Sequence, residues 1–326
     1  MSKELADTIK AIACPGKGIL AADESTSTIG KRFATIGLEN SETNRKRYRS
    51  LIATTKNLGD FISGVILFEE TLTQKAITGE KLVDVFTSQN IIPGIKVDKG
   101  LVSLNEKSGE QITQGLDGLR ERLIEYKKQG ARFAKWRNVY TIGDNTPSDY
   151  LVHLNAQALA RYARLCQEQN IVPIVEPEVL MDGTHSIDEC YVATRKALLS
   201  VFAELRLHKV ALEYMILKPN MVISATSANV QASTNEVARQ TVTVLKECVP
   251  AIVPSINFLS GGQTPQNATQ NLAAMNKLPK LPWNLSFSYG RALQEECLSV
   301  WQGRDENLAK AQQALLAAAK ANANAC

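Results

Sequence analysis

Short apolar runs alternate with longer amphipathic stretches along most of the chain. The runs predict eight strands, at residues 18–23, 61–68, 91–98, 131–137, 171–178, 214–218, 251–259 and 284–289. Helical periodicity fills most of the intervals between them. In residues 149–169, for example, one stripe carries Leu151, Leu154, Ala158, Tyr162 and Leu165. Further helices are predicted at residues 187–207, 230–248, 266–276 and 291–301.

Eight strands that alternate with helices over one continuous length favour an α/β fold, a (β/α)8 TIM barrel. A doubly wound open sheet is the alternative, but no Gly-rich nucleotide turn follows the first strand to favour it. No linker-like change in composition divides the chain, so residues 1–326 are predicted to form a single domain. An extra helix is predicted before the first strand, at residues 5–14, and an alanine-rich helix ends the chain at residues 307–321.

Composition narrows the class of protein. With 44% apolar and 21% charged residues the chain is typical of soluble globular proteins. Its net charge of +4 is spread along the sequence without a basic tail, so a nucleic-acid partner is not expected. No apolar run approaches the ~20 residues that a membrane helix needs. The first residues lack the pattern of a signal peptide, so we expect a cytoplasmic protein without a membrane partner.

Cysteine and histidine usage supports the same expectation. Six scattered cysteines without short pairings indicate reduced thiols in a cytosolic protein. The three histidines lie outside any metal-type cluster with Cys or acidic partners. We therefore expect no metal and no cofactor.

Charged residues lie late in five of the predicted strands. Because strand residues two apart share a face, Lys96 lies with Asp98, Lys135 with Arg137, and Glu176 with Glu178. Lys218 ends the sixth strand and Asp23 the first. Each pair alone is compatible with a rim that faces helices or solvent. In a barrel, however, the C-terminal strand ends carry the catalytic residues, and charges at five ends predict one common cavity.

Glycine-containing loops after the last two strands favour phosphate binding. The seventh strand is followed by Ser260, Gly261 and Gly262, with a helix starting at Thr264-Pro265. The eighth is followed by Tyr289-Gly290-Arg291, again beside a helix start. These two loops and a helix N-terminus form the usual phosphate site of this fold.

A second anion site is possible after the first strand, where residues 23–28 carry several hydroxyl groups. Ser25 and Thr28 are the candidates there, with Lys31 and Arg32 nearby. A simple helix cap explains the same residues equally well.

These residues predict a reaction that proceeds through an amine. Lys218 is the candidate nucleophile, and we expect burial and the charge of Lys135 to lower its pKa. Glu176 and Glu178 lie close enough for mutual repulsion and burial to raise one carboxyl pKa, which suits a proton donor and acceptor. An iminium formed from Lys218 and a ketone would act as the electron sink. The expected substrate is a small anionic carbonyl compound such as a sugar phosphate.

With these residues assembled, the chain resembles class I fructose-bisphosphate aldolase over essentially its whole length. Seven stretches carry the resemblance in order: GKGILAADES at 16–25, GIKVDKG at 94–100, AKWR at 134–137, IVPIVEPE at 171–178, LKPNM at 217–221, LSGGQ at 259–263 and FSYGRA at 287–292. The resemblance implies reversible cleavage of fructose 1,6-bisphosphate to dihydroxyacetone phosphate and glyceraldehyde 3-phosphate, without a metal, in glycolysis and gluconeogenesis. It also implies a homotetramer.

The resemblance implies a role for each matched residue. Lys218 matches the Schiff-base lysine, and Glu176 the acid/base of carbinolamine formation and dehydration. Glu178 supports the lysine site, Lys135 assists proton transfer and holds substrate, and Asp23 handles the C4 hydroxyl proton. Ser260, Gly261, Gly290 and Arg291 match the C1-phosphate site, and Ser25, Lys96 and Thr28 the C6-phosphate site, with Thr28 where a serine is usual. Arg137, Gly262 and Tyr289 complete the predicted substrate site.

Two alternatives to a bisphosphate specialist stay open: a Schiff-base enzyme for other ketose phosphates, and an interaction protein that uses the barrel as a scaffold. The vertebrate-type family continues past the region matching residues 321–326 into a tail ending in a tyrosine, assigned to proton transfer at the enamine. The present sequence ends at Cys326. If the protein lacks that tail, we expect Glu176 or water to move the enamine proton.

Overall fold

The computed structural model describes residues 2–105, 109–279 and 281–326. Eight parallel strands close into a barrel in the order β1-β10-β9-β8-β7-β6-β3-β2. Their bounds are β1 Gly18–Ala22, β2 Ile62–Leu67, β3 Ile92–Lys96, β6 Phe133–Tyr140, β7 Val172–Val179, β8 Ile216–Leu217, β9 Ser255–Phe258 and β10 Asn284–Tyr289. All eight predicted strands are present, and the (β/α)8 barrel is confirmed.

Five predicted strands are longer than the real ones, most clearly those at 214–218 and 251–259. The run at 214–218 yields only β8, because Tyr214 belongs to a short 3₁₀ turn, Leu212–Tyr214. The run at 251–259 yields only β9, because the chain around Ala251 is an exposed turn that Pro250 and Pro254 bracket. Proline removes a backbone donor and fixes φ, so strand pairing begins after Pro254. In the opposite direction, β6 continues past Arg137 to Tyr140.

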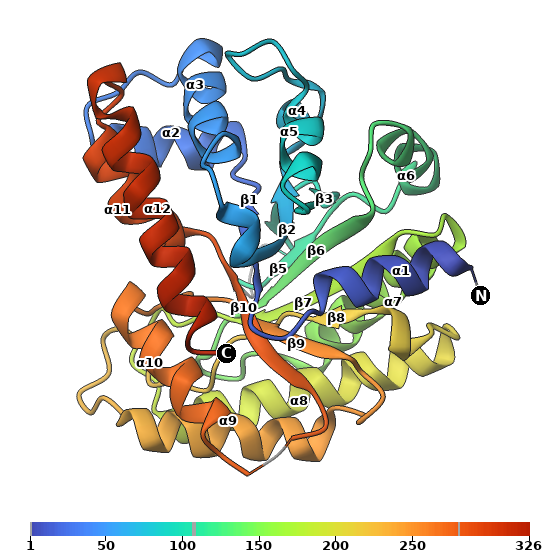
Figure 1. Ribbon diagram of the computed structural model, residues 1–326. Coiled ribbons are helices and arrows are strands. Elements are labelled where there is room, and N and C mark those ends of the chain that lie inside the picture. Colours follow the sequence, from blue (N-terminus) through green and yellow to red (C-terminus); the bar gives the residue numbers. More distant parts are fainter. Residues whose placement is uncertain (1, 106–108, 280) are drawn as a thin grey trace.

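Helices surround the barrel (Figure 1). They are α1 Lys3–Ile12, α2 Thr26–Ala34, α3 Glu42–Ala53, α4 Glu69–Thr73, α5 Leu82–Ser88, α6 Leu119–Lys128, α7 Asp149–Glu168, α8 Ile187–Leu207, α9 Thr234–Cys248, α10 Pro265–Asn276, α11 Arg291–Trp301 and α12 Leu308–Ala323. The strands β4 Leu101–Ser103 and β5 Gln111–Thr113 pair separately as an antiparallel ribbon. In the part of the chain that the structure describes, no helix combines the length and apolar character that crossing a membrane requires.

Two apolar cores stabilise the barrel. The larger one lies between the strands and the outer helices. The smaller one fills the barrel interior, where Phe133, Ile174 and Ile216 pack against Leu5 and Ile12 of α1. Since Ile216 and Phe133 are the first residues of their strands, α1 covers the N-terminal end of the barrel. The opposite, C-terminal end is left for polar residues.

The last helix, α12, contacts two helices that lie far apart in the sequence, α3 and α10. Figure 1 shows α12 beside α3, and Gln312 on α12 donates hydrogen bonds to the Leu51 carbonyl and the Thr54 hydroxyl of that region. At its far end Asn322 accepts a hydrogen bond from Thr269 on α10. These contacts hold α12 along the outside of the barrel, away from the strand ends that carry the charged residues.

Candidate active site

A cavity of about 860 Å³ opens at the C-terminal ends of the strands. Its lining comes from strands and loops all around the barrel, as the fold requires when loops at one end share a common centre. Fourteen of the fifteen predicted site residues line it: Asp23, Ser25, Thr28, Lys96, Lys135, Arg137, Glu176, Glu178, Lys218, Ser260, Gly261, Gly262, Gly290 and Arg291. Sequence reasoning therefore identified the residues that converge on the cavity.

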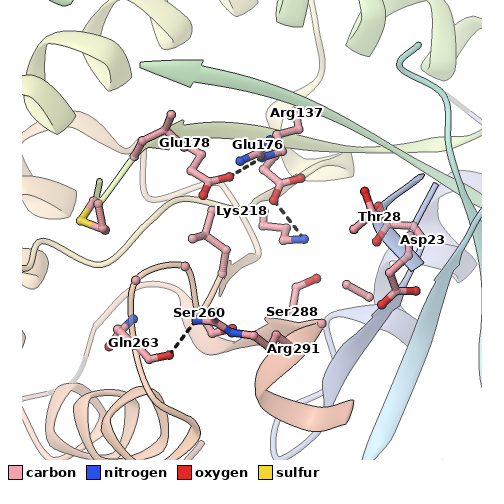
Figure 2. Close-up of a pocket in the computed structure, with 18 of the residues that line it drawn as sticks. Asp23, Thr28, Arg137, Glu176, Glu178, Lys218, Ser260, Gln263, Ser288 and Arg291 are labelled. Carbon is pink, nitrogen blue, oxygen red and sulfur yellow. Dashed lines mark hydrogen bonds and ion pairs between the residues drawn. The ribbon is translucent and has the colours of Figure 1, made fainter. Parts of the chain in front are cut away.

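Lys218 lies at the centre of this cavity, directly after the short strand β8. Its backbone N–H donates to the Val175 carbonyl of β7, at 2.8 Å, so the residue still follows the barrel ladder. Its Nζ is 3.1 Å from Oε1 of Glu176, and both residues are at least 96% buried. Figure 2 shows the two side chains pointing toward one another. A lysine in this position has a carboxylate, and no bulk water, as its immediate neighbour.

Lys135 occupies the space between two carboxylates. Its Nζ is 2.7 Å from Oδ2 of Asp23 and 3.3 Å from Oε2 of Glu176. Burial alone would lower the pKa of Lys135, but the charges of Asp23, Glu176 and Asp98 outweigh that effect and raise it. Burial would likewise raise the pKa of Asp23, yet the charges of Lys135 and Lys218 lower it to about 2. Lys135 is thus held as a cation and Asp23 as an anion.

The two lysines approach opposite oxygens of Glu176. Lys218 contacts Oε1 and Lys135 contacts Oε2, so one carboxylate lies between the two ammonium groups. We expected Lys135 to act on Lys218 as a nearby like charge. The contacts instead show that the charge of Glu176 separates them, which offsets the repulsion.

Glu178 has a cation partner of its own. It forms a salt bridge with Nε of Arg137, visible in Figure 2. Burial would lower the pKa of Arg137, but the charge and hydrogen bond of Glu178 raise it. The two carboxylates thus contact different cations, which lessens the mutual repulsion that we expect between them.

Lys96 and Asp98 pair, although Asp98 lies beyond the end of β3 and not on a strand face as predicted. Nζ of Lys96 is 2.5 Å from Oδ1 of Asp98 and also donates to its carbonyl oxygen, at 2.9 Å. Ser25 accepts a hydrogen bond from the backbone N–H of Thr28 and caps α2. The capping explanation is thus correct for Ser25, although both hydroxyl residues also line the cavity.

The Ser260–Gly262 loop passes so close to its neighbours that side chains there would collide. A Cβ on Gly261 would lie 2.9 Å from Oε1 of Glu178. Gly262 has φ +73°, and a Cβ there would lie 2.4 Å from Cβ of Met181. The loop ends where Thr264 caps α10 and Pro265 takes its first turn, as predicted. Backbone N–H groups at this helix start favour an anion in the cavity.

Arg291 begins α11 and faces the same side of the cavity as Ser260 (Figure 2). Its Nη2 donates to the Gln263 carbonyl, at 3.2 Å. The other cavity-lining lysines and arginines, Arg32, Lys96, Lys135, Arg137 and Lys218, each have a carboxylate within ion-pair distance. Among the residues that the structure describes, Arg291 is the cavity-lining lysine or arginine without such a partner, so its charge is available to a ligand.

Tyr289 is the one predicted site residue that does not line the cavity. Its side chain is fully buried and donates a hydrogen bond to the Ala268 carbonyl of α10, at 3.1 Å, outside the cavity. Ser288 lines the cavity instead, and its buried hydroxyl has no hydrogen-bond partner. Neighbouring strand residues face opposite sides, so Ser288 and Gly290 point inward only if Tyr289 points outward. That alternation was readable in the sequence.

Sequence reasoning also missed the partner of Arg32. Glu24, which directly follows Asp23, is buried and forms a salt bridge with Arg32 at the cavity wall. Gln294 on α11 donates to the same carboxylate, at 2.9 Å. No sequence spacing links these three residues, because they meet only when α11 packs beside α2.

Cofactor ligands are the remaining question for this cavity. In the described ranges, no group of three or more His, Cys, Asp and Glu side chains is arranged to hold a metal ion. The ionisable groups that line the cavity are lysines, arginines and carboxylates.

Comparisons with known proteins agree on one family. The family model described as "Glycolytic: Fructose-bisphosphate aldolase class-I" matches residues 4–326. A probable fructose-bisphosphate aldolase class 1 of Xanthomonas axonopodis pv. citri is 54% identical over 321 residues, 98% of this chain and 96% of the relative. The cytosolic fructose-bisphosphate aldolase 4 of Arabidopsis thaliana is 52% identical over 315 residues, 96% of this chain and 80% of the relative.

A solved structure of the same family is also similar to this chain. The fructose-bisphosphate aldolase of Plasmodium falciparum, crystallised in a ternary complex with TRAP and a small-molecule inhibitor, superposes with a TM-score of 0.97. It is 52% identical in sequence, and the match covers 99% of this chain and 94% of that one.

Proposed function

The chain belongs to the class I fructose-bisphosphate aldolase family, whose members are aldehyde-lyases, and we propose that it works through a Schiff base on Lys218 without a metal. The proposed reaction is the reversible cleavage of fructose 1,6-bisphosphate to dihydroxyacetone phosphate and glyceraldehyde 3-phosphate. The observation that carries this proposal is the buried contact between Nζ of Lys218 and Oε1 of Glu176, at 3.1 Å. It places a proton donor and acceptor within reach of an amine.

The first step forms the covalent intermediate. Proton transfer to Glu176 leaves Lys218 as a neutral amine, whose lone pair attacks the C2 carbonyl of the substrate to give a carbinolamine. Glu176 then returns a proton to the C2 hydroxyl, which leaves as water, and the C2–N bond becomes an iminium. The 3.1 Å contact supports Glu176 as the acceptor of the amine proton, since a general base works within about 2.6–3.2 Å of the heavy atom whose proton it takes.

The second step breaks the C3–C4 bond. Asp23 accepts the proton of the C4 hydroxyl, C4 becomes the aldehyde, and the electron pair of the C3–C4 bond moves to the iminium to give an enamine. The lowered pKa of Asp23 keeps it ionised and able to accept, but its close contact with Lys135 makes it a weak base. Lys135 contacts Oδ2, so we assign the substrate hydroxyl to Oδ1. Protonation of the enamine and hydrolysis then release dihydroxyacetone phosphate and restore Lys218.

Two ends of the cavity suit the two phosphates. We assign the C1-phosphate to Ser260, Gly261, Gly290 and Arg291, because Arg291 has no carboxylate partner and two helices begin there. We assign the C6-phosphate to Ser25, Thr28 and Lys96 on the other side, where Lys96 must exchange its contact with Asp98 for the ligand. Arg137 and Gly262 complete the lining.

The proposal also covers the cellular location, the pathway and the oligomeric state. A cytoplasmic enzyme of glycolysis and gluconeogenesis agrees with relatives named cytosolic and with the family description. A homotetramer of single-domain barrels is proposed on the family resemblance alone. Size-exclusion chromatography with light scattering tests the assembly, and a dimeric or monomeric mass would refute it.

Cleavage of fructose 1,6-bisphosphate, followed by coupled reduction of dihydroxyacetone phosphate, tests the activity and its metal independence. We expect turnover in the presence of excess EDTA and none in Lys218→Met. Loss of activity with EDTA that zinc or another divalent ion restores would contradict the proposal. Full activity in Lys218→Met would contradict it as well.

A further inference from the structure

Strand β7 extends well beyond the strand that should support it. β8 pairs with β7 only at Ile216 opposite Ile174 and at Leu217 opposite Val175, and Pro219 then ends the ladder. β7 nevertheless continues to Val179 and carries Glu176 and Glu178 on this extension. On the side toward β8, both glutamates therefore stand on a strand without a neighbouring strand.

On the side toward β8, the extension of β7 has one backbone N–H group that needs a hydrogen-bond acceptor. Lys218 N–H bonds to the Val175 carbonyl, so the backbone groups of Val175, Pro177 and Val179 face β8 by strand alternation. Pro177 has no N–H, whereas Val179 has one that is buried and needs an acceptor.

The side chain of Asn220 supplies that acceptor. Its Oδ1 accepts the hydrogen bond from Val179 N–H at 3.0 Å, in the place of a strand carbonyl. Its Nδ2 donates to Oγ1 of Thr194 on α8 at 3.0 Å and to the Met221 carbonyl at 3.1 Å. Asn220 is 2% exposed, so these bonds are shielded from water.

We propose that Asn220 is a positioning residue that fixes the amine of Lys218 relative to Glu176 and Glu178. Asn220 lies two residues after Lys218 and binds the residue that directly follows Glu178, so one side chain connects the two strand ends that carry the reacting groups. This inference rests on the proposed Schiff-base function. It deepens that function by assigning the geometry of the Lys218–Glu176 contact to a residue outside the cavity lining.

Two other hydrogen bonds of the 219–222 segment lead to β9 and α9. Leu259 N–H on the β9 side bonds to the Pro219 carbonyl at 3.0 Å. Val222 N–H bonds to Oγ1 of Thr241 on α9 at 2.9 Å. Thr241 therefore offers a matched control, because it is a fully buried threonine that anchors the same segment to a helix and not to β7 by this hydrogen bond.

The test compares Asn220→Ala, Thr194→Val and the control Thr241→Val in the full-length protein. Each is measured for kcat and KM with fructose 1,6-bisphosphate, for the rate of borohydride inactivation in dihydroxyacetone phosphate, and for Tm. Because a displacement of about 1 Å can cost ~100-fold in rate, we expect Asn220→Ala to lower kcat and trapping roughly 10- to 100-fold with KM nearly unchanged. Thr194→Val should show the same pattern at roughly 3- to 10-fold. Thr241→Val should lower Tm but leave trapping within about twofold of wild type.

Two results would overturn this inference and leave the proposed function standing. One is a wild-type trapping rate in both Asn220→Ala and Thr194→Val. The other is an equal loss of trapping rate in Thr241→Val, which would indicate lost stability and not lost positioning. If Asn220→Ala does not fold, the comparison of Thr194→Val with Thr241→Val decides. An absent adduct in wild-type protein would overturn the proposed function, and this inference with it.

Discussion

Replacing Lys135 by methionine removes the charge that lies between Asp23 and Glu176 while keeping the length of the apolar stem. The lysine side chain is 4% exposed, so its charge is largely shielded from solvent. The variant leaves Lys218 as the ion-pair partner of Glu176 and leaves Asp23 without its 2.7 Å contact. We expect a large loss of stability at neutral pH, separate from any loss of activity.

The magnitude follows from the pKa of Asp23 and from the burial of the pair. That pKa lies at about 2 in place of 3.8. Since one pKa unit corresponds to about 1.4 kcal/mol, the folded state favours ionised Asp23 by ~2.5 kcal/mol, to which Lys135 and Lys218 both contribute. Removing one partner of a buried ion pair typically costs ~3–5 kcal/mol. We therefore expect the free energy of unfolding at about pH 7 to fall by ~3–5 kcal/mol.

The pH dependence of the stability loss distinguishes a missing charge from a disrupted apolar core, because only the missing charge makes the loss change with pH. In wild type the pKa of Asp23 is lower in the folded state, so its stabilisation is present above about pH 4 and is lost as the pH falls toward 2. In Lys135→Met the excess of buried carboxylates raises their pKa values, so the folded state binds protons more readily than the unfolded chain. The difference between variant and wild type should thus shrink between about pH 7 and pH 4.

Urea unfolding at several pH values measures both effects, with Lys99→Met as the control. Lys99 pairs with Glu69 at the surface, where the two side chains are 44% and 49% exposed, so its removal should cost less than ~1 kcal/mol at every pH. If Lys135→Met is as mild as Lys99→Met, or if its loss is the same at all pH values, the charge assignment of the cavity is wrong.

Three further variants test the ligand end of the cavity. Arg291→Ala should raise KM for fructose 1,6-bisphosphate roughly 10- to 100-fold, the effect of losing a charged hydrogen bond of ~1.5–3 kcal/mol, and an unchanged KM would count against the phosphate assignment. Lys96→Met should lower kcat/KM for fructose 1,6-bisphosphate but leave kcat/KM for fructose 1-phosphate within about twofold of wild type, since that substrate lacks the C6-phosphate. Equal losses of kcat/KM for both substrates would show that Lys96 does not bind the C6-phosphate. Gly262→Ala should lower the free energy of unfolding by more than the control Gly37→Ala, because Gly37 has a similar φ of +66° but open space where a Cβ would lie. Chemical denaturation measures both variants, and equal losses would show that Met181 can move aside at little cost in free energy.

The barrel was predictable because apolar runs mark its strands, but the runs do not mark where pairing stops. The apolar run at 214–218 reads as an ordinary strand, yet only Ile216 and Leu217 pair. The 3₁₀ turn before β8 and Pro219 after it limit the paired segment to these two residues. Short elements were missed as well. Five-residue α4 and the β4–β5 ribbon are too brief for periodicity to rise above the background.

The site residues were predictable from strand ends, whereas their partners were not. Two-residue spacing correctly placed Lys135, Arg137, Glu176 and Glu178 in the cavity. It does not reveal that Lys135 reaches Asp23, because that contact joins strands far apart in the barrel order. The cation partners of the two glutamates were hidden for the same reason, since partner choice depends on side chains from other strands.

Borohydride reduction in the presence of dihydroxyacetone phosphate, followed by peptide mass spectrometry, shows directly whether Lys218 forms the Schiff base. We expect irreversible inactivation, one reduced adduct per chain on the peptide that contains Lys218, and no adduct there in Lys218→Met. Arg291→Lys serves as a control that changes phosphate binding but keeps the amine. Full activity after reduction, or an adduct on Lys135 or another lysine with Lys218 unmodified, would contradict the account.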